Sequence, residues 1–434
     1  MASSLSSSSM TMDFEHFGHK VYSTISQNKN NQNVFLSPAS IALAMSMCTV
    51  GARQETLKQM LNVFGVPSID DLTKTAEKVM HIFSIADNDK QVKLKLANRL
   101  YAQKAYKLQQ DYLSLVQNSF KADIKLEDFE NNSDHVVQTI NTWVEEQTNK
   151  LIQNLLSKND VSRDTRLIIV NCIYFKGTWL KQFEKSSTNQ NADFHESNGK
   201  ISKIKLMYKK EKYAYAENND LNVQIAHLPY KSDNHYVQFV FTVILPKKGV
   251  SLDEVERKLT SKPELMQQVL SHQNTTTQEL LLHLPKFKME ATFVLNDVLI
   301  QLGMVNAFSG GKADFTGIVS EEDDRNGLYI SKVIHKAFID VNEQGSEAAA
   351  ATAVIMTRES CLIHRKSDPI EFKADRSEAA AATAVVMADC RLSISSKPSS
   401  IEFKADRPFL FFIRESRKNI VLFSGKFVSP PTAS

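Results

Sequence analysis

Hydrophobic residues recur at helical spacing through the first third of the chain. Residues 13–25 form an amphipathic helical pattern, and the run 33–38 predicts a short buried strand stopped by proline. Ser37 can then cap a helix whose first turn accepts Pro38, because the missing N–H is not needed there. We expect that helix, 39–47, to be deeply buried because it is apolar nearly all round. Further helices are predicted at 54–61, 69–83, 110–119 and 133–148.

The hydrophobic pattern changes after residue 150. Residues 167–175 are almost uniformly apolar, which is typical of a strand buried on both faces. Further strands are predicted at 237–245, 279–284, 329–341, 409–413 and 420–423. Because helices come first and strands follow, with few βαβ alternations, the order indicates an α+β fold.

The chain shows no internal linker. No Pro/Gly/Ser-rich stretch divides its 434 residues, and 42% of them are hydrophobic, which is enough for a sizeable core. We therefore predict one domain at 13–434, preceded by a disordered polar tail at 1–12. The 52 basic and 49 acidic residues give a net charge of only +3, which argues against a nucleic-acid partner. The basic segment 203–212 is interpreted as a solvated strand and turn.

Cysteine spacing and motif searches indicate no metal, no cofactor and no catalytic centre. Cys48, Cys172, Cys361 and Cys390 have neither zinc-site spacing nor the density of a disulfide framework. No nucleophile elbow, phosphate-binding loop or HExxH motif is present, so an enzyme is not expected.

Two locations of the protein are compatible with the sequence, the cytoplasm and the extracellular space. No apolar run is long enough to span a membrane, and no signal peptide is visible at the N-terminus. Two glycosylation sequons, at Asn131 and Asn274, would matter only in a secreted protein.

A tandem repeat occupies residues 346–407. Its two copies, 346–376 and 377–407, align without gaps and agree at 19 of 31 positions. The first nine and last seven positions match, whereas 357–362 and 388–393 match nowhere. Matching ends with unrelated centres suggest alternative exons for interchangeable segments, a hypothesis that transcript sequencing would test.

The alanine-rich segment at the start of the first copy is compatible with two conformations. Alanine is the best helix former, yet this run lies between two strand-like segments. In a strand, Glu347 would lie on one face, and the other face would carry Ser346, Ala348, Ala350, Thr352, Val354 and Met356. Such a segment could enter a sheet without placing a bulky or charged group in the core.

Several motifs resemble those of serpins, the serine protease inhibitor superfamily, over essentially the whole chain after the first dozen residues. The hinge of inhibitory serpins is similar to 341–352 (VNEQGSEAAAAT). Further family signatures match NVFLSPASI (33–41), VNCIYFKGTW (170–179), LPKF (284–287) and PFLFFIR (408–414). The alanine-rich hinge and the missing signal peptide resemble the ovalbumin-like, intracellular branch. The resemblance implies about nine helices, three β-sheets and an exposed reactive-centre loop near the C-terminus.

The resemblance also implies a mechanism. A serine or cysteine protease attacks the loop and forms an acyl-enzyme. The cleaved hinge then inserts into the central sheet and traps the protease covalently. The native state of such a protein, expected here to be a monomer, is held kinetically rather than at its free-energy minimum.

The family likeness assigns roles to several residues of this chain. Four polar residues resemble the shutter beneath the central strands: Ser37, Ser40, Asn171 and His335. Trp179 resembles the breach tryptophan, where insertion begins. The hinge would comprise Gly345, Ser346, Glu347, Ala348, Ala349, Ala350, Ala351 and Thr352, with Gly345 supplying flexibility.

Several peptide bonds are candidates for cleavage by the target protease. The usual family register puts Glu359 before the bond and Ser360 after it, while a trypsin-like protease would cut after Arg358. In the second copy the same register gives Cys390, followed by Arg391. The doubled loop also leaves open a non-inhibitory serpin with a substrate, chaperone or storage role, although the small hinge residues argue against it.

Overall fold

The computed structural model describes residues 5–29, 31–271, 274–320, 327–346 and 400–431. The chain divides into two units. The first contains Met1–Ala349 and Ser400–Ser434, and the description that follows concerns this unit. The second unit, Ala350–Ser399, lies outside the described residues.

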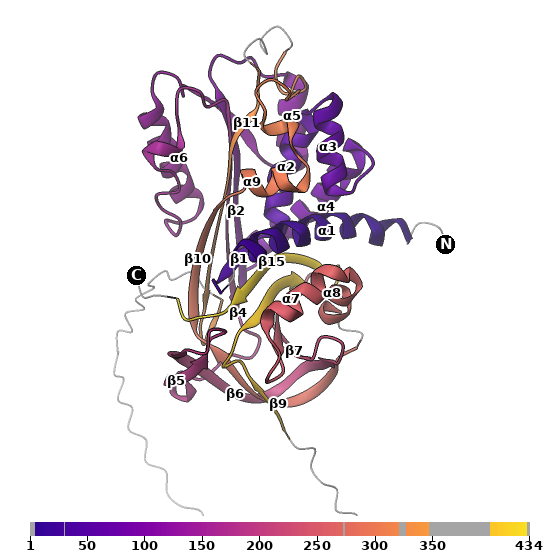
Figure 1. Cartoon of the computed structure of the whole chain (residues 1–434), viewed down its shortest axis with the longest axis vertical. Coiled ribbons are helices and arrows are strands. Elements are labelled where there is room, and N and C mark those ends of the chain that lie inside the picture. Colours follow the sequence, from indigo (N-terminus) through magenta and orange to yellow (C-terminus); the bar gives the residue numbers. More distant parts are fainter. Residues whose placement is uncertain (1–4, 30, 272–273, 321–326, 347–399, 432–434) are drawn as a thin grey trace, which may run out of the picture. The chain divides into compact units, whose positions relative to one another are not determined.

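A six-stranded sheet forms the centre of the first unit (Figure 1). Its strands, in spatial order, are β10 (Phe287–Val294), β11 (Ile330–Val341), β12 (Gly345–Ser346), β4 (Leu167–Thr178), β2 (Val92–Gln103) and β3 (Asp123–Glu127). Strands β11 and β4 also pair directly, in parallel, from Ile330 opposite Leu167 to Phe338 opposite Tyr174. Beyond Phe338 they separate, and β12 lies between them.

The remaining strands form one nine-stranded sheet. Its main path is β1 (Val34–Leu36), β15 (Ile420–Phe427), β14 (Phe409–Glu415), β8 (Phe239–Pro246), β7 (Val223–Pro229), β6 (Ile201–Asn218), β9 (Thr276–Pro285) and β13 (Ile401–Lys404), with β5 (Asn189–His195) beside β6. In the described residues this one sheet replaces two of the three expected. The physical reason is the length of β6, which pairs with β5, β7 and β9 and so joins strands that would otherwise form separate sheets.

Nine α-helices occur in the described residues, as the family likeness implies. They are α1 (Leu5–Asn28), α2 (Pro38–Gly51), α3 (Gln54–Phe64), α4 (Ile69–Asn88), α5 (Gln110–Phe120), α6 (Ser133–Gln147), α7 (Leu252–Ser261), α8 (Pro263–Leu270) and α9 (Asn296–Leu302). Short 3₁₀ turns are η1 (Lys158–Asp160), η2 (Lys185–Ser187) and η3 (Asn306–Phe308). None of the described helices is long and apolar enough to cross a membrane.

Helix α1 corrects the predicted N-terminal tail. It begins at Leu5, so most of the segment 1–12, which was predicted to be disordered, is helical. Helix extension adds one hydrogen bond for each residue fixed once a nucleus exists. The buried Phe14 and Phe17, packed on Phe64, anchor that nucleus. A serine-rich sequence can therefore continue a helix that packing has already started.

Helices cover both faces of the six-stranded sheet (Figure 1). Along β4, alternate side chains point to opposite faces. Ile168 and Val170 belong to the apolar cluster under α6, while Ile169 and Phe175 belong to the main core on the side of α2 and α4. This double coverage explains why β4 is apolar from Leu167 to Phe175 at every position except Asn171.

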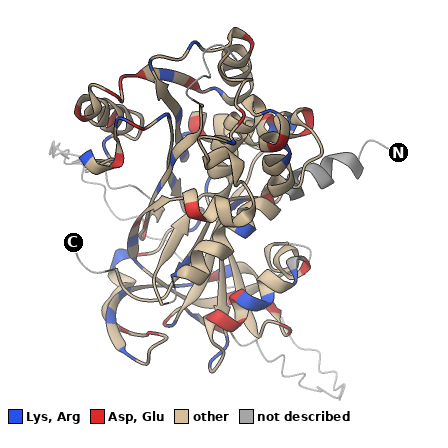
Figure 2. Cartoon of the chain, turned by 45° about the horizontal axis from the view of Figure 1, so that its top comes forward, with Lys and Arg blue, Asp and Glu red and all other residues tan. Residues whose placement is uncertain are grey.

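The distribution of charged residues agrees with the small net charge of the sequence. In the view of Figure 2, acidic and basic residues are interspersed along helices and strands. The whole basic segment 203–212 lies in strand β6, and Lys203 and Lys210 pair with Asp193 and Glu279. The segment is a strand, as interpreted, and continues through Asn218 rather than turning.

Candidate functional site

The functional-site candidate lies where β11 and β4 separate. Strand β12 enters the gap antiparallel to both neighbours. Gly345 is opposite Thr178, and Ser346 is opposite both Gly177 on β4 and Val341 on β11. Two hinge residues predicted from the sequence therefore already form the start of a strand inside the central sheet. We call Gly345–Ser346 the wedge.

The wedge is held by close packing. A Cβ atom at Gly345 would lie 1.9 Å from the carbonyl oxygen of Gly177, so only glycine fits there without a backbone shift. The role of this glycine in the structure is thus close approach of two backbones rather than the flexibility that the sequence suggested. Ser346 is fully buried, and its hydroxyl is 2.6 Å from the hydroxyl of Tyr230.

A tight turn leads from β11 into the wedge. The amide of Asn342 donates to the carbonyl of Gly345, and the side-chain oxygen of Asn342 accepts from the amide of Gln344 at 2.9 Å. Trp179 fastens this turn, because its indole Nε1 donates to the carbonyl of Asn342 at 2.9 Å and its amide donates to the carbonyl of Gln344. Its ring stacks on Tyr230 at a centroid distance of 4.5 Å. The tryptophan predicted for the breach therefore lies beside the wedge.

Sequence reasoning missed Glu343, at the tip of the same turn. Its side chain is 5% exposed, accepts from Lys286 Nζ at 2.8 Å and accepts from the Thr188 hydroxyl at 3.0 Å. Burial alone would raise the pKa of Glu343, but the hydrogen bonds from Lys286 and Thr188 outweigh burial and lower it. Glu343 lies inside the motif 341–352, but a single sequence does not reveal which residues its side chain contacts.

The four predicted shutter residues lie together beneath the strands. The amide of Ser37 donates to His335 Nε2 at 3.1 Å, and the hydroxyl of Ser40 donates to Asn171 Oδ1 at 3.0 Å. His335 Nδ1 also bonds Asn171 Oδ1. The hydroxyl of Ser37 donates to the carbonyl of Leu422 on β15. All four predicted side chains are fully buried, so the network links α2, β4, β11 and the second sheet.

The contacts of His335 define its protonation state. Because Nε2 accepts from a backbone N–H, the proton must sit on Nδ1, which donates to Asn171. Burial lowers the pKa of His335 to about 3, and the bond to Asn171 offsets only part of that effect. The imidazole is therefore neutral at physiological pH.

Asn98 on β2 extends the network and was not predicted. Asn171 Nδ2 donates to Asn98 Oδ1, and Asn98, Asn171 and His335 occupy one row across β2, β4 and β11. Asn98 is one of several polar residues of β2, so no local signal in the sequence set it apart. Its partner became visible only with the strand register.

The remaining predicted site residues lie outside the described residues. These are the hinge residues Glu347, Ala348, Ala349, Ala350, Ala351 and Thr352, and the bond candidates Arg358, Glu359, Ser360, Cys390 and Arg391. Among the described residues, no group of three or more His, Cys, Asp or Glu side chains could hold a metal ion. Burial raises the thiol pKa of both Cys48 and Cys172.

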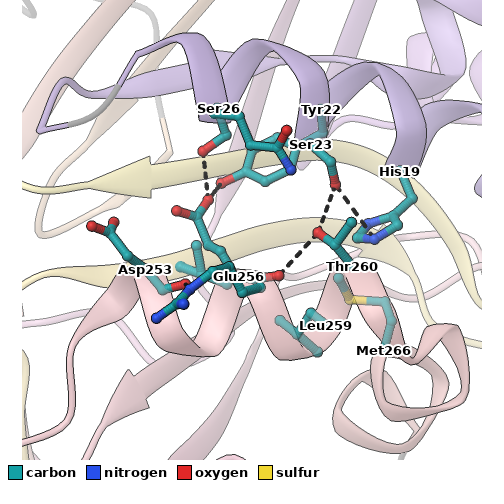
Figure 3. A pocket seen from close by; sticks show the side chains of 12 residues that line it. His19, Tyr22, Ser23, Ser26, Asp253, Glu256, Leu259, Thr260 and Met266 are labelled. Carbon is teal, nitrogen blue, oxygen red and sulfur yellow. Dashed lines mark hydrogen bonds between the residues drawn. The ribbon is translucent and has the colours of Figure 1, made fainter. Parts of the chain in front are cut away.

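A separate cavity lies between α1 and α7 (Figure 3). It measures about 370 Å³ and is lined on one side by His19, Tyr22 and Ser23 and on the other by Leu259 and Thr260. Desolvation is the main reason why the pKa of His19 is lowered to about 4.

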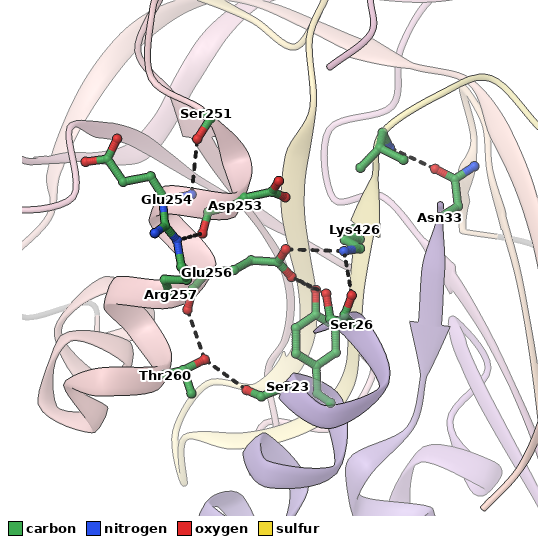
Figure 4. A network of polar contacts seen from close by, with 12 residues as sticks. Ser23, Ser26, Asn33, Ser251, Asp253, Glu254, Glu256, Arg257, Thr260 and Lys426 are labelled. Carbon is green, nitrogen blue, oxygen red and sulfur yellow. Dashed lines mark hydrogen bonds and ion pairs between the residues drawn. The ribbon is translucent and has the colours of Figure 1, made fainter. Parts of the chain in front are cut away.

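At one end of the cavity, Glu256 of α7 joins three elements (Figure 4). It accepts from Tyr22 at 2.9 Å and Ser26 at 2.6 Å, both on α1, and pairs with Lys426 of β15 at 3.3 Å. These contacts satisfy the partly buried carboxylate and connect α1 to the second sheet.

Comparison with known proteins agrees with this geometry. The family model described as "Serpin (serine protease inhibitor)" matches residues 13–430. Human leukocyte elastase inhibitor is 32% identical over 417 residues, which cover 95% of this chain and 97% of that protein. The structure of Arabidopsis AtSerpin1 in its native stressed conformation superposes with a TM-score of 0.78 at 28% identity and covers 98% of both chains. Uncleaved ovalbumin superposes with a TM-score of 0.75 at 27% identity, over 96% of this chain and 98% of that one.

Proposed function

The chain belongs to the serpin family, and from this premise we propose that it inhibits a serine protease of trypsin-like specificity as a suicide substrate. The protease would cleave the loop after the wedge, remain bound as an acyl-enzyme and be displaced as the loop enters the sheet. The observation that carries the proposal is the wedge itself, because two residues of the expected insertion strand already lie between β11 and β4.

Continuing the strand pairing of the wedge in the same register predicts where each residue of the inserted loop would lie. Ser346 is opposite Gly177 and Val341, and antiparallel pairing moves one residue at a time. Thr352 would then lie between Asn171 and His335. Insertion would separate these two side chains, which now bond each other directly. The shutter would thus have to open before the strand could pass.

The face presented by each inserted residue follows from the same register. Ser346 contacts Tyr230, which belongs to the main core, so even-numbered residues would face that core and odd-numbered residues would face α6. Ala348, Ala350 and Thr352 are small, so each would add little side-chain volume on the core face. A long cationic side chain at one of these positions would bury an unpaired charge.

A pair of matched variants tests this proposal. Ala350→Arg should block insertion, whereas Ala381→Arg makes the same change at the equivalent position of the second copy and should leave inhibition intact. Each protein is incubated with trypsin and with a Glu-directed protease, and a complex that survives denaturing electrophoresis is measured. We expect the complex with the wild type and Ala381→Arg and simple cleavage with Ala350→Arg.

Mass spectrometry of the released C-terminal peptide identifies the bond. Cleavage by trypsin should leave a peptide that begins at Glu359, and cleavage by a Glu-directed protease one that begins at Ser360. Cleavage in the second copy, after Cys390 or Arg391, would separate the protease from the wedge by far too long a segment to hold it, so we expect turnover there. If all proteases only cleave the wild type and none is retained, the inhibitor proposal is wrong and a non-inhibitory serpin is the better description.

A further inference from the structure

Strand β2 is an inner strand of the six-stranded sheet over only part of its length. Strand β4 pairs with it from Val92 to Ala102, whereas β3 begins only opposite Arg99. Among the described residues, no strand lies beside 92–98 on the side away from β4. This part of β2 is therefore an edge of the sheet.

The register shows which backbone groups point outward at this edge. The carbonyl of Gln91 accepts from the amide of Thr178 at 3.0 Å, and the amide of Gln103 donates to the carbonyl of Arg166 at 3.0 Å. Bonded pairs alternate along an antiparallel ladder, so the odd-numbered residues of β2 bond β4. The even-numbered residues direct their N–H and C=O groups away from β4, and at the edge these are Leu94, Leu96 and Asn98.

A cleft of about 970 Å³ borders this edge and is lined by all three of these residues. We call it the edge cleft. One wall comes from α4 and α5 and carries Phe83, Val116 and Phe120, which belong to the main core. The other wall comes from α6 and carries Trp143. Leu96 is partly exposed between the two walls.

The charges of the edge cleft are balanced. Arg99 pairs with Asp123 at 2.6 Å where β3 begins, and Lys95 pairs with Asp87 at 2.7 Å. The charged residues of the lining are three basic and three acidic: Lys95, Arg99, Lys121, Asp87, Asp123 and Glu146. Such a lining does not favour a highly charged ligand such as a polyanion.

Lysines protect only the beginning of the edge. Lysine is a common device against unwanted pairing at sheet edges. Here Lys93 Nζ donates to the carbonyl of Asp87 at 2.8 Å, and Lys95 pairs with the carboxylate of the same residue. Leu96 and Asn98 follow these lysines and form the part of the edge that is open to pairing.

We propose that the edge cleft binds an extended peptide segment of a partner protein, which adds to β2 in line with β3. The backbone of an extended peptide repeats its pairing groups at the spacing of Leu96 and Asn98, so it can satisfy both. Side chains on one face of the added strand would meet the apolar wall of α4 and α5, and those on the other face would meet α6. The segment that fits is therefore uncharged and alternates apolar and polar residues.

Asn98 connects the edge cleft to the shutter. Its side-chain oxygen accepts from Asn171 Nδ2, and the two residues lie opposite each other in the ladder. A peptide that pairs with the backbone of Asn98 would bind directly beside this polar network. The proposal does not depend on whether the loop inhibits a protease.

A synthetic peptide tests the site on the wild-type chain. The peptide acetyl-Thr-Val-Thr-Val-Thr-amide is added, and hydrogen exchange of single backbone amides is followed by mass spectrometry. At a peptide concentration about ten times the Kd, exchange at Leu96 and Asn98 should slow roughly tenfold. The amide of Ala97 already bonds β4 and should change little. Unchanged exchange at Leu96 and Asn98 up to the solubility limit of the peptide would overturn the proposal.

Methylated peptides distinguish strand pairing from other binding. Successive N–H groups of a strand point to opposite edges, so methylation of the valine amides or of the threonine amides blocks one edge only. One methylated peptide should bind like the parent and the other should lose binding, according to the direction of pairing. Equal affinities of the two would overturn strand addition. Protection of Leu96 and Asn98 that grows with protein concentration, without peptide, would identify a second copy as the occupant and would also overturn it.

A pair of variants tests the amide of Leu96. Leu96→Pro removes the outward N–H without removing a hydrogen bond to β4. Leu96→Ala is the matched control, because it shortens the side chain and keeps the N–H. We expect the peptide to bind Leu96→Ala and not Leu96→Pro, and equal binding to both would contradict the proposal. The methylated peptides give the decision on the wild-type chain even if Leu96→Pro does not fold.

Discussion

Gly345 shows how a single residue can decide whether the wedge forms. Its Cα lies so close to β4 that an added methyl group would overlap the carbonyl oxygen of Gly177. The sequence indicated a special glycine here, but it suggested flexibility, because a close backbone approach depends on the neighbouring strand and cannot be read from local sequence.

We expect Gly345→Ala to push the wedge out of the sheet and to destabilise the native state by about 1–3 kcal/mol, the usual cost of overpacking. Thermal unfolding followed by circular dichroism measures the change. Gly311→Ala is the matched control, because a Cβ there meets no atom within 4 Å. Equal midpoints for the two variants would contradict the proposed close fit.

His335 gives the shutter a defined pH dependence. Its folded pKa of about 3 lies below the ordinary value of 6.5, so between these values the unfolded chain binds more protons than the folded one. The stabilising contribution is complete above about pH 6.5 and is lost as the pH falls toward 3, by up to about 1.4 kcal/mol per pH unit.

The comparison of wild type with His335→Gln isolates this contribution. The midpoint of the wild type should fall more steeply than that of the variant when the pH is lowered from 7 to 5. His19, whose pKa is also lowered, affects both proteins equally. Parallel pH profiles would assign the acid sensitivity to other groups.

Among the elements, α1 and α7 are joined to β15 by the partly buried carboxylate of Glu256. The side chain of Lys426 is 1% exposed, so its ammonium depends on this carboxylate and on the carbonyl of Ser26 for compensation. Removing the anion would leave a buried cation without a charged partner.

Glu256→Gln should therefore destabilise the fold by about 3 kcal/mol. The chain offers a control on the same helix, since Glu254 forms an exposed pair with Lys258 at 2.8 Å. Glu254→Gln should leave the urea midpoint nearly unchanged. A small effect at both positions would mean that water or another group can satisfy Lys426.

The elements also show what periodicity could and could not predict. Helix α2 and strand β4 were recognised because each is apolar on every face and is buried on every face. Helices α7 to α9 were missed because they are short. Strand β6 was recognised only in part, because its many lysines hide the alternation.

For the folded chain as a unit, the sequence predicted the α+β class and the family, but not the joining of two expected sheets through β6. That joining depends on pairing between residues far apart in the chain. The polar cluster of Ser37, Ser40, Asn171 and His335 was predicted through family likeness alone, since no spacing rule places these residues together.

Cleavage within the first copy should make the protein more stable, if the proposed insertion takes place. A new strand between β11 and β4 would satisfy backbone groups along both neighbours and release the kinetically held state. We expect a large rise in the thermal midpoint after cleavage at 358–360. Uncut protein is the control, because a cut at 390–391 would also free residues 347–356 to enter the sheet. An unchanged midpoint after cleavage in the first copy would argue against insertion.

The position of Trp179 has an optical consequence. The chain has two tryptophans, and only Trp179 stacks on Tyr230 and donates to the turn before the wedge, whereas Trp143 lies on α6 near Arg99. In Trp143→Phe, all indole emission would come from the place where the sheet opens. The intrinsic fluorescence of that protein would report the arrival of the loop in real time, without any attached dye.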